Sequence, residues 1–431
     1  MKEISHLTLS PAAKFSGEIV LPGSKSMSNR ALLLAALSTG TTEIKNLLTS
    51  DDTEYMQKAL LQLGVEIIPT GPVSVKLKGV GQNWAQKERA EFYLGNAGTA
   101  MRSLTAALCL GRGDFTLTGD PRMLERPIGD LVDALRQAGA NIDYLGQESY
   151  PPMRIQARGL QGGTVRIKGN TSSQYLSALL MAGPYAAQPL TIEVEGELIS
   201  KPYVNITLNE MRRFGINVEN DDFKRFVVPQ GSYVSPGVLE VEGDASAASY
   251  FLAGAALAHG PVRVKGAGRS SVQGDVLFAE VLQKMGAQVE WGPDWIEVRG
   301  GTLRGVDLDL NHIPDAAMTL VPLALFAQGS TTLRNIGSWR VKETDRIHAM
   351  ATEARKIGAQ VEEGPDYLVI NPRPVSEYVH TDIDTYDDHR MAMSFALVSL
   401  GGISVTINDP KCVEKTFPNY FAEFQKMLSY N

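Results

Sequence analysis

The sequence predicts an α/β protein of two domains, each built from three similar units of strands and helices. Its 431 residues exceed what one hydrophobic core usually serves, so two large domains are expected. A pattern of helix end, glycine and alternating strand recurs five times, with its glycines at positions 64, 139, 215, 286 and 358. The resulting gaps of 75, 76, 71 and 72 residues indicate internal duplication.

Each copy of the pattern is interpreted as a helix, its C-terminal cap and a strand, because glycine suits the left-handed cap position. A sixth copy would fall near the end of the chain, so the helix pattern around residues 424–428 is interpreted as a copy cut before its strand. Six units give three per domain. Chance recurrence of glycine-ended helices is the alternative, and near-constant spacing makes it the poorer explanation.

Domain boundaries are predicted near residues 22 and 240. Residues 19–24 and 239–246 both read as a strand, a turn and a capped helix of small residues. This similarity predicts a discontinuous first domain of residues 1–22 and 241–431, and a second domain of residues 23–240. Two crossovers would join them.

Composition describes an ordinary globular protein and argues against several functions. The net charge of −7 does not suit a general nucleic-acid surface. No apolar run reaches the roughly 18 residues of a membrane span, and the first residues lack the apolar region of a signal peptide. Two cysteines, Cys109 and Cys412, indicate a reduced, cytoplasmic location, and no spacing of histidines or cysteines indicates a metal.

Residues 21–37 have the features of an anion site. A Pro-Gly turn follows a strand-like run, and Ser24 can cap the next helix, which begins with Lys25, Ser26 and then Arg30. Free N–H groups at a helix start, with two cations beside them, favour a bound anion. An ordinary capped helix with a solvated basic start is an equal alternative for this segment alone.

Further segments of the N-terminal half place polar groups at turns before helices. Small residues around Gly98 would let a compact ligand approach the backbone. Arg122 and Arg126 lie in a proline-containing loop that suits a two-point grip on carboxylate or phosphate. Hydroxyl and amide groups precede other helices at Ser172, Ser173, Gln174, Ser200 and Tyr203. Tight packing, surface salt bridges and plain N-caps explain these residues as well in isolation.

The C-terminal half has comparable segments. Asp315 before an apolar helix is either a general base or a first-turn acid, and the sequence alone favours the structural role. If residues 339–346 are helical, Lys342 and Arg346 share one face with Glu343 adjacent, although a solvated charged face is the usual explanation. Arg390 and Lys415 lie at further element starts or loops.

Taken together, the cations of both halves predict a site between two domains. Such a site would hold a multiply anionic ligand and close around it.

Ten segments resemble, in order, the EPSP synthase (3-phosphoshikimate 1-carboxyvinyltransferase) family, most closely its enteric-type bacterial form. They are LPGSKSMSNRALLLAAL, LGNAGTAMR, ERPIGDLVDALRQAGA, SSQYLSALL, SKPY, EGDASAASYFLAGAA, NHIPDAAMT, WRVKETDR, DDHRMAMSFALV and DPKCVEKTFP. The resemblance covers nearly the whole chain. It implies two domains of three βαβαββ units each, an inside-out α/β barrel, which agrees with the six-unit spacing.

The resemblance also implies an activity in the shikimate pathway of aromatic amino-acid biosynthesis. The enolpyruvyl group of phosphoenolpyruvate would pass to the 5-hydroxyl of shikimate 3-phosphate by addition and elimination, with release of phosphate. Neither a metal nor an organic cofactor is expected. A cytoplasmic monomer without nucleic-acid or membrane partners is expected, and glyphosate would occupy the phosphoenolpyruvate site.

Site residues follow from the same resemblance. Shikimate 3-phosphate would contact Ser26, Arg30, Ser172, Ser173, Gln174, Ser200, Tyr203, Asp315, Ser338 and Lys342. Phosphoenolpyruvate would contact Lys25, Gly98, Arg126, Gln174, Arg346, Arg390 and Lys415. Proton chemistry would fall to Asp315, Glu343 and Lys25, with Asp315 suited to the base and the other two to acid roles. Which of them moves each proton stays open.

The chain departs from the family at two positions. The family usually has proline where this chain has Ser103, and proline there would fix the start of the helix that presents Gly98 and Thr99. Ser103 therefore predicts a slightly shifted turn and weaker inhibition by glyphosate. Ser338 replaces a usual asparagine, and its shorter hydroxyl would lose a direct substrate contact or use water.

Three other functions fit less well. The related enolpyruvyl transferase acting on UDP-N-acetylglucosamine normally has a cysteine near residues 120–126, and this chain has none there. A P-loop NTPase would need GxxxxGK[ST], which the sequence lacks. A non-catalytic anion-binding protein would need neither Asp315 nor Glu343.

Overall fold

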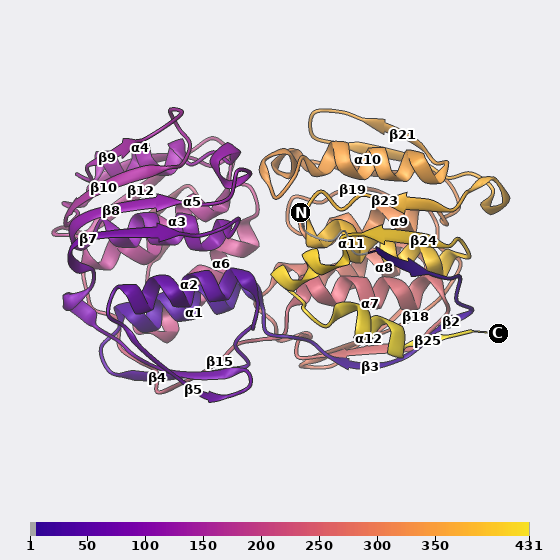
Figure 1. The fold of residues 1–431 in the computed structure, drawn as a ribbon, viewed down its shortest axis with the longest axis horizontal. Helices are drawn as coiled ribbons and strands as arrows, with labels where there is room; N and C mark the ends of the chain where they lie inside the picture. Colours follow the sequence, from indigo (N-terminus) through magenta and orange to yellow (C-terminus); the bar gives the residue numbers. More distant parts are fainter. Residues whose placement is uncertain (1–5, 431) are drawn as a thin grey trace. The chain divides into compact units, whose positions relative to one another are not determined.

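The computed structural model describes residues 6–430, which divide into two compact units (Figure 1). The central unit is Gly23–Val241, and the terminal unit comprises the chain up to Pro22 and from Glu242 onward. Val241 belongs to the central unit, where its N–H donates to the carbonyl of Lys45 at 3.0 Å. Among the described residues, no helix has both the length and the apolar character to cross a membrane.

The central unit contains three four-stranded sheets of one topology. In spatial order, the first sheet consists of β15 (Val238–Glu240), β4 (Thr41–Lys45), β6 (Ser74–Lys78) and β5 (Glu66–Gly71). The second consists of β7 (Gln86–Tyr93), β8 (Arg112–Thr118), β10 (Met153–Arg158) and β9 (Ile142–Tyr144). The third consists of β11 (Gly163–Lys168), β12 (Leu190–Glu195), β14 (Arg225–Val228) and β13 (Glu219–Asp221). The first two strands of each sheet are parallel, and the other neighbours are antiparallel. Parallel neighbours need a crossover connection, which a helix supplies.

Helices of two kinds accompany these sheets. The helices α1 (Lys25–Leu37), α3 (Gly98–Leu108) and α5 (Ser173–Ala182) are buried on nearly all sides. The helices α2 (Asp51–Gln62), α4 (Gly129–Gln137) and α6 (Lys201–Arg213) bury one face each. A helix that is buried all round belongs to the interior, so the first set forms the inside of the unit.

The terminal unit repeats this plan with one variation. Its four-stranded sheets are, in order, β17 (Gln288–Trp291), β18 (Trp295–Arg299), β16 (Val262–Lys265) and β3 (Gly17–Val20); and β19 (Asp307–Asp309), β20 (Thr331–Arg334), β22 (Leu368–Asn371) and β21 (Gln360–Glu363). The third sheet has three strands, β1 (His6–Leu9), β24 (Val405–Asn408) and β23 (Thr381–Ile383). A separate pair joins β2 (Lys14–Phe15) to β25 (Leu428–Ser429).

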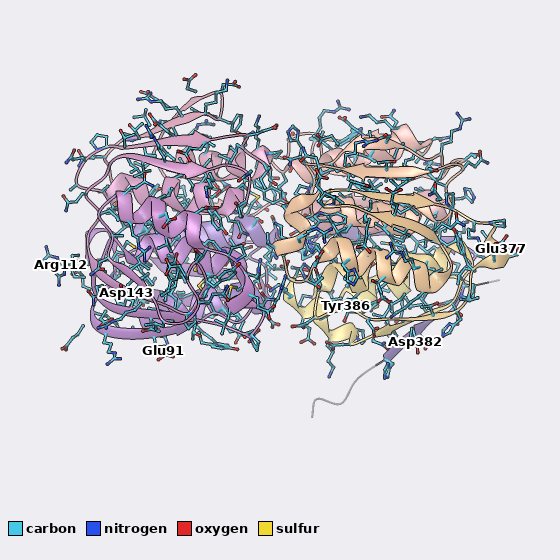
Figure 2. The ribbon with its side chains drawn as sticks, turned by 90° about the horizontal axis from the view of Figure 1, so that it is seen from above. Glu91, Arg112, Asp143, Glu377, Asp382 and Tyr386 are labelled. Atoms are coloured by element: carbon cyan, nitrogen blue, oxygen red, sulfur yellow. The ribbon has the colours of Figure 1, made fainter. Side chains whose placement is uncertain are left out.

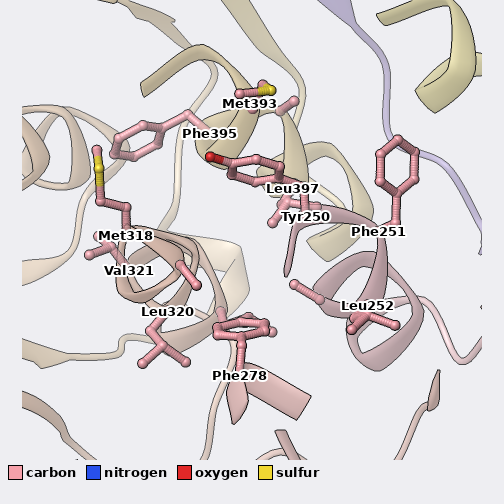
Figure 3. Packing of buried hydrophobic residues seen from close by; sticks show 14 of the residues in the cluster. Tyr250, Phe251, Leu252, Phe278, Met318, Leu320, Val321, Met393, Phe395 and Leu397 are labelled. Carbon is pink, nitrogen blue, oxygen red and sulfur yellow. The ribbon is translucent and has the colours of Figure 1, made fainter. Parts of the chain in front are cut away.

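Buried helices again form the interior of the terminal unit. They are α7 (Ala245–Leu257), the 3-10 helix η5 (Ala316–Thr319) with α9 (Leu320–Ala324), and α11 (His389–Phe395) with η8 (Ala396–Gly401). Figure 3 shows part of this core, where Tyr250 of α7, Met318 of η5 and Phe395 of α11 belong to one cluster. The helices α8 (Phe278–Met285), α10 (Arg346–Ile357) and α12 (Tyr420–Lys426) complete the unit.

The five repeated glycines confirm the predicted helix ends. Gly286 and Gly358 directly follow the last residues of α8 and α10, and the other three follow α2, α4 and α6 after one intervening residue. All five have a positive φ, from 86° at Gly64 to 119° at Gly358. A strand follows every one of them. The glycine therefore recurs because the left-handed cap position favours a residue without a Cβ atom.

The prediction for the sixth copy was partly wrong. Helix α12 is followed by a two-residue strand, β25, so the chain is not cut before its strand. This strand pairs with β2 instead of joining the third sheet, and β1 takes the antiparallel position beside β24. The N-terminal segment thus completes the last repeat.

Candidate active site

Arg30 is a buried cation with several hydrogen-bond partners in the central unit. It is 3% exposed, its Nε donates to Thr207 Oγ1 at 2.8 Å, and its Nη1 donates to the Ser26 carbonyl at 2.9 Å. Its Nη2 lies 3.3 Å from Ser177 Oγ and 3.4 Å from the Tyr203 carbonyl. Burial lowers the pKa of Arg30 to about 10, so the group remains cationic at neutral pH. These contacts join α1 to α5 and α6.

Lys25 begins α1, and its Nζ lies 3.4 Å from the Asp52 carboxylate of α2. Ser24 is the N-cap residue, but its side chain makes no capping bond, so that part of the prediction was wrong. Ser200, which precedes α6, is an N-cap with a left-handed φ of 54°. Such a conformation in a non-glycine residue is uncommon and often occurs at functional sites.

Gly98 and Arg126 are in close contact. A Cβ atom added at Gly98 would lie 2.6 Å from Arg126 Nη2, so a larger residue at this position would displace the guanidinium group. Arg126 Nη1 donates to the Asn96 carbonyl at 3.0 Å and to Asn96 Oδ1 at 2.8 Å. Arg122, in contrast, pairs with the exposed Glu125 at 3.1 Å, which is the surface salt bridge that the sequence offered as an alternative.

The start of α5 lies beside the start of α3. Ser172 caps α5 by accepting the Gln174 N–H at 3.2 Å, which is the plain N-cap that the sequence offered as an alternative. Gln174 Nε2 then donates to Thr99 Oγ1 at 3.3 Å, one residue after Gly98. Ser173 is buried in the same turn. The amide and hydroxyl groups of this turn therefore lie next to the Gly98–Arg126 pair.

In the terminal unit, one carboxylate bridges two predicted arginines. Asp315 Oδ1 accepts from Arg346 Nη1 at 3.1 Å, and its Oδ2 accepts from Arg390 Nη2 at 3.0 Å. Arg390 Nη1 also donates to the Tyr250 hydroxyl at 3.2 Å. Asp315 stands at the N-cap position of η5, but its side chain makes no capping bond there.

Arg346 lies among three carboxylates. Its Nε and Nη2 reach the two oxygens of Asp388 at 2.7 Å and 3.2 Å, and Nη2 also reaches Glu343 at 2.9 Å. Burial alone would lower the pKa of Arg346, but the charges of Asp388, Glu343 and Asp315 outweigh it and raise the pKa. Asp388 caps α11 by accepting the Arg390 N–H at 3.0 Å.

The remaining predicted residues lie at the ends of short helices. Ser338 belongs to the 3-10 helix η6 (Gly337–Val341), and Lys415 is the buried last residue of η9 (Pro410–Lys415), which packs against α11. Lys342 follows η6 in an extended conformation, and α10 begins only at Arg346. The condition for a shared helical face of Lys342 and Arg346 is therefore not met, because the chain is not helical between them.

Sequence reasoning missed three buried carboxylate or amide partners of the predicted cations. They are Asp52 beside Lys25, Asn96 beside Arg126 and Asp388 beside Arg346. Asn96 and Asp388 stand in segments that the sequence singles out, so their positions were a signal. No sequence signal indicates Asp52, because its pairing with Lys25 depends on how α2 packs against α1.

Ser103 does not lie at the helix start. It is the sixth residue of α3, where its Oγ donates to the Thr99 carbonyl at 2.7 Å. A proline at this position would remove the helical N–H, so its effect would reach Thr99 and Gly98 through the helix and not through a turn. The expected shift of the turn is thereby corrected.

The chemistry that these groups can perform is clear for each unit. Arginines held in place by carboxylates and carbonyls present planar donor pairs that suit carboxylate or phosphate oxygens. Asp315 and Glu343 next to them can accept or donate protons. Within residues 6–430, no three His, Cys, Asp or Glu side chains are grouped as metal ligands.

Comparisons with known proteins agree on one family. The sequence profile of EPSP synthase (3-phosphoshikimate 1-carboxyvinyltransferase) matches residues 9–424. The 3-phosphoshikimate 1-carboxyvinyltransferases of Vibrio atlanticus (strain LGP32) and Vibrio cholerae serotype O1 (strain M66-2) are each 59% identical over 98% of this chain and 99% of their own.

Solved structures show the same likeness. An EPSP synthase from Acinetobacter baumannii is 27% identical with a TM-score of 0.82, and 99% of each chain is covered. The enolpyruvyl transferase NikO from Streptomyces tendae is 17% identical with a TM-score of 0.79 over 99% of this chain and 98% of its own, which supports the fold alone.

Proposed function

This chain belongs to the EPSP synthase family, and on that premise we propose that the buried cations of its two units bind the two anionic substrates. The enzyme transfers the enolpyruvyl group of phosphoenolpyruvate to the 5-hydroxyl of shikimate 3-phosphate and releases phosphate, a step of aromatic biosynthesis. The observation that carries the site assignment is the bridge from Asp315 to Arg346 and Arg390.

Phosphoenolpyruvate is assigned to cations from both units. Arg346, Arg390 and the nearby Lys415 in the terminal unit, and Arg126 with Lys25 in the central unit, offer the charge that its phosphate and carboxylate require. Gly98 leaves space beside Arg126 because it has no Cβ.

Shikimate 3-phosphate is assigned to the hydroxyl-rich helix starts of the central unit together with groups of the terminal unit. Support comes from the contacts that join Arg30 to Ser26 and Tyr203, and from the capped turn that precedes α5. The proposed ligands are Ser26, Arg30, Ser172, Ser173, Gln174, Ser200, Tyr203, Asp315, Ser338 and Lys342.

The proton chemistry is assigned to two carboxylates and one lysine. In the addition step, the 5-hydroxyl oxygen bonds to C2 of phosphoenolpyruvate, its proton goes to a base, and an acid protonates the methylene carbon. In the elimination step, the methyl group loses a proton and the C–O bond to phosphate breaks. Asp315 is proposed as the base, with Glu343 and Lys25 at the methylene carbon and the leaving phosphate.

Phosphate release tests this function directly. Purified protein given both substrates is expected to release one phosphate for each enolpyruvyl group transferred, and neither substrate alone should yield phosphate. A non-catalytic anion-binding protein would bind both ligands without release. Folded protein that releases no phosphate would defeat the assignment.

The Ser103→Pro variant is expected to be inhibited more strongly by glyphosate. Loss of the N–H and of the Ser103 contact to Thr99 moves the start of α3, and with it Gly98 beside Arg126. We expect the inhibition constant to fall about three- to tenfold, a change of about 0.6–1.4 kcal/mol. Ser103→Ala, which keeps the helical N–H, is the control and should stay close to the unchanged enzyme. Equal inhibition constants for Ser103→Pro and the unchanged enzyme would contradict this prediction.

We also propose a location and an oligomeric state. Both cysteines are buried as free thiols, which suits a cytoplasmic enzyme. We propose a monomer, which light scattering coupled to gel filtration would test by measuring the mass against 46.7 kDa.

A further inference from the structure

Two consecutive residues before α11 have left-handed backbone conformations. Tyr386 has a φ of 55° and Asp387 a φ of 56°, and neither is glycine. The turn is closed by the Asp388 N–H, which donates to the Thr385 carbonyl at 2.9 Å. Left-handed conformations are unfavourable for residues with a Cβ, so contacts with the rest of the protein must hold the turn in place.

The buried carboxylate of Glu353 in α10 supplies such contacts. Its Oε1 accepts from the Tyr386 hydroxyl at 2.7 Å, and its Oε2 accepts from the Asp384 N–H at 3.1 Å. Lys356 provides the opposite charge, with Nζ 2.9 Å from Glu353 and 2.7 Å from Asp384. One carboxylate thus binds the chain on both sides of Thr385.

Packing alone does not fix Tyr386, because its side chain is 39% exposed at the surface of the terminal unit (Figure 2). The hydrogen bond to Glu353 is therefore what orients the ring. A hydrogen bond to an ionised acceptor is among the stronger ones in proteins, which suits this task.

The same helix and the same turn also position the two arginines. Arg346 begins α10 and contacts both oxygens of Asp388, which in turn caps the helix that carries Arg390. Glu353 follows Arg346 by seven residues, which is about two helical turns, so both lie on one face of α10. Helix α10 consequently contacts residues 384–388 at two places on that face.

We propose that Glu353 and Tyr386 are positioning residues for phosphoenolpyruvate binding. They hold the strained turn, the turn places Asp388, and Asp388 sets the spacing between Arg346 and Arg390. This inference rests on the proposed function, because it takes both arginines as ligands of phosphoenolpyruvate. It adds two residues that do not touch substrate to those that determine its affinity.

The Tyr386→Phe variant tests the proposal, with Tyr367→Phe as a matched control. Tyr367 donates to Glu362 at 2.8 Å, so the control loses a similar tyrosine–glutamate bond in the same unit, on the β21–β22 hairpin. Loss of a hydrogen bond to a charged group is expected to raise the KM for phosphoenolpyruvate about tenfold in Tyr386→Phe. The KM for shikimate 3-phosphate should change less than about twofold, because most of its proposed ligands lie in the central unit.

Steady-state kinetics with each substrate varied at saturation of the other gives the result. A rise of both KM values together, or a KM for phosphoenolpyruvate equal to that of Tyr367→Phe, would overturn the proposal. Thermal unfolding of each variant shows whether it is folded at the assay temperature.

An Arg390→Lys variant separates this inference from the proposed function. If Arg390→Lys raises the KM for phosphoenolpyruvate and Tyr386→Phe does not, the positioning role fails and the ligand assignment stands. If Arg390→Lys leaves that KM unchanged, the ligand assignment fails and the inference that rests on it fails as well.

Discussion

Replacement of Asp315 by asparagine is expected to lower kcat by about 10²–10⁴-fold, the range that a positioned general base contributes. The amide keeps the shape of the side chain but cannot take the proton from the 5-hydroxyl. It also leaves Arg346 and Arg390 facing a neutral group in place of the carboxylate that bridges them at 3.1 Å and 3.0 Å. Initial rates of phosphate release at saturating concentrations of both substrates measure the effect.

The matched control for this variant is Asp307→Asn. Asp307 also binds an arginine with both oxygens, Arg334 at 2.6 Å and 2.7 Å, but that pair is exposed on β19 and β20. We expect its kcat to stay within about twofold of the unchanged enzyme, since exposed ion pairs contribute little. A kcat for Asp315→Asn as high as that of the control would exclude Asp315 as the base.

Replacement of Arg346 by lysine is expected to lower both the stability of the terminal unit and the affinity for phosphoenolpyruvate. The guanidinium group donates to Asp388, Glu343 and Asp315 with its three nitrogen atoms, whereas the single nitrogen of an ammonium group cannot reach all three carboxylates. A buried carboxylate left without its partner costs about 3–5 kcal/mol. We expect the KM for phosphoenolpyruvate to rise about 100-fold, which corresponds to about 2.7 kcal/mol.

Arg355→Lys is the control on the same helix. Arg355 is 40% exposed and pairs with Glu363 at 2.8 Å, so a lysine can replace it at small cost. Thermal unfolding and the KM for phosphoenolpyruvate should both stay near those of the unchanged enzyme. An Arg346→Lys variant that behaves like Arg355→Lys would contradict a shared role of Arg346 in folding and binding.

The repeat was predictable from sequence because its signal is local. A glycine at the cap position answers a backbone requirement that any helix of this kind imposes, and the structure confirms it at all five positions, such as Gly64 and Gly358. Ser172 as a cap of α5 was predictable for the same reason. Both depend only on neighbouring residues.

The polar network was not predictable because it depends on tertiary packing. The sequence favoured a dipole role for Asp315, yet its carboxylate accepts from two arginines that lie 31 and 75 residues further along the chain. The pairing of Lys25 with Asp52 likewise requires α1 and α2 to be packed together. For Lys342 and Arg346 the sequence allowed a helical spacing, but the chain is extended at Lys342.

The first strands of the chain pair with strands that come much later in the sequence, and this affects the order of folding during synthesis. Strand β15 pairs with β4, so every strand of the central unit has been translated once residue 241 is made. Strands β1, β2 and β3 are made first, but their partners are β24, β25 and β16, which lie 245 residues or more later in the chain. Such distant pairing is slow, and nascent domains fold as units when their residues emerge. Strands β1, β2 and β3 are therefore expected to stay unpaired until these partners are made, and the central unit is expected to fold first.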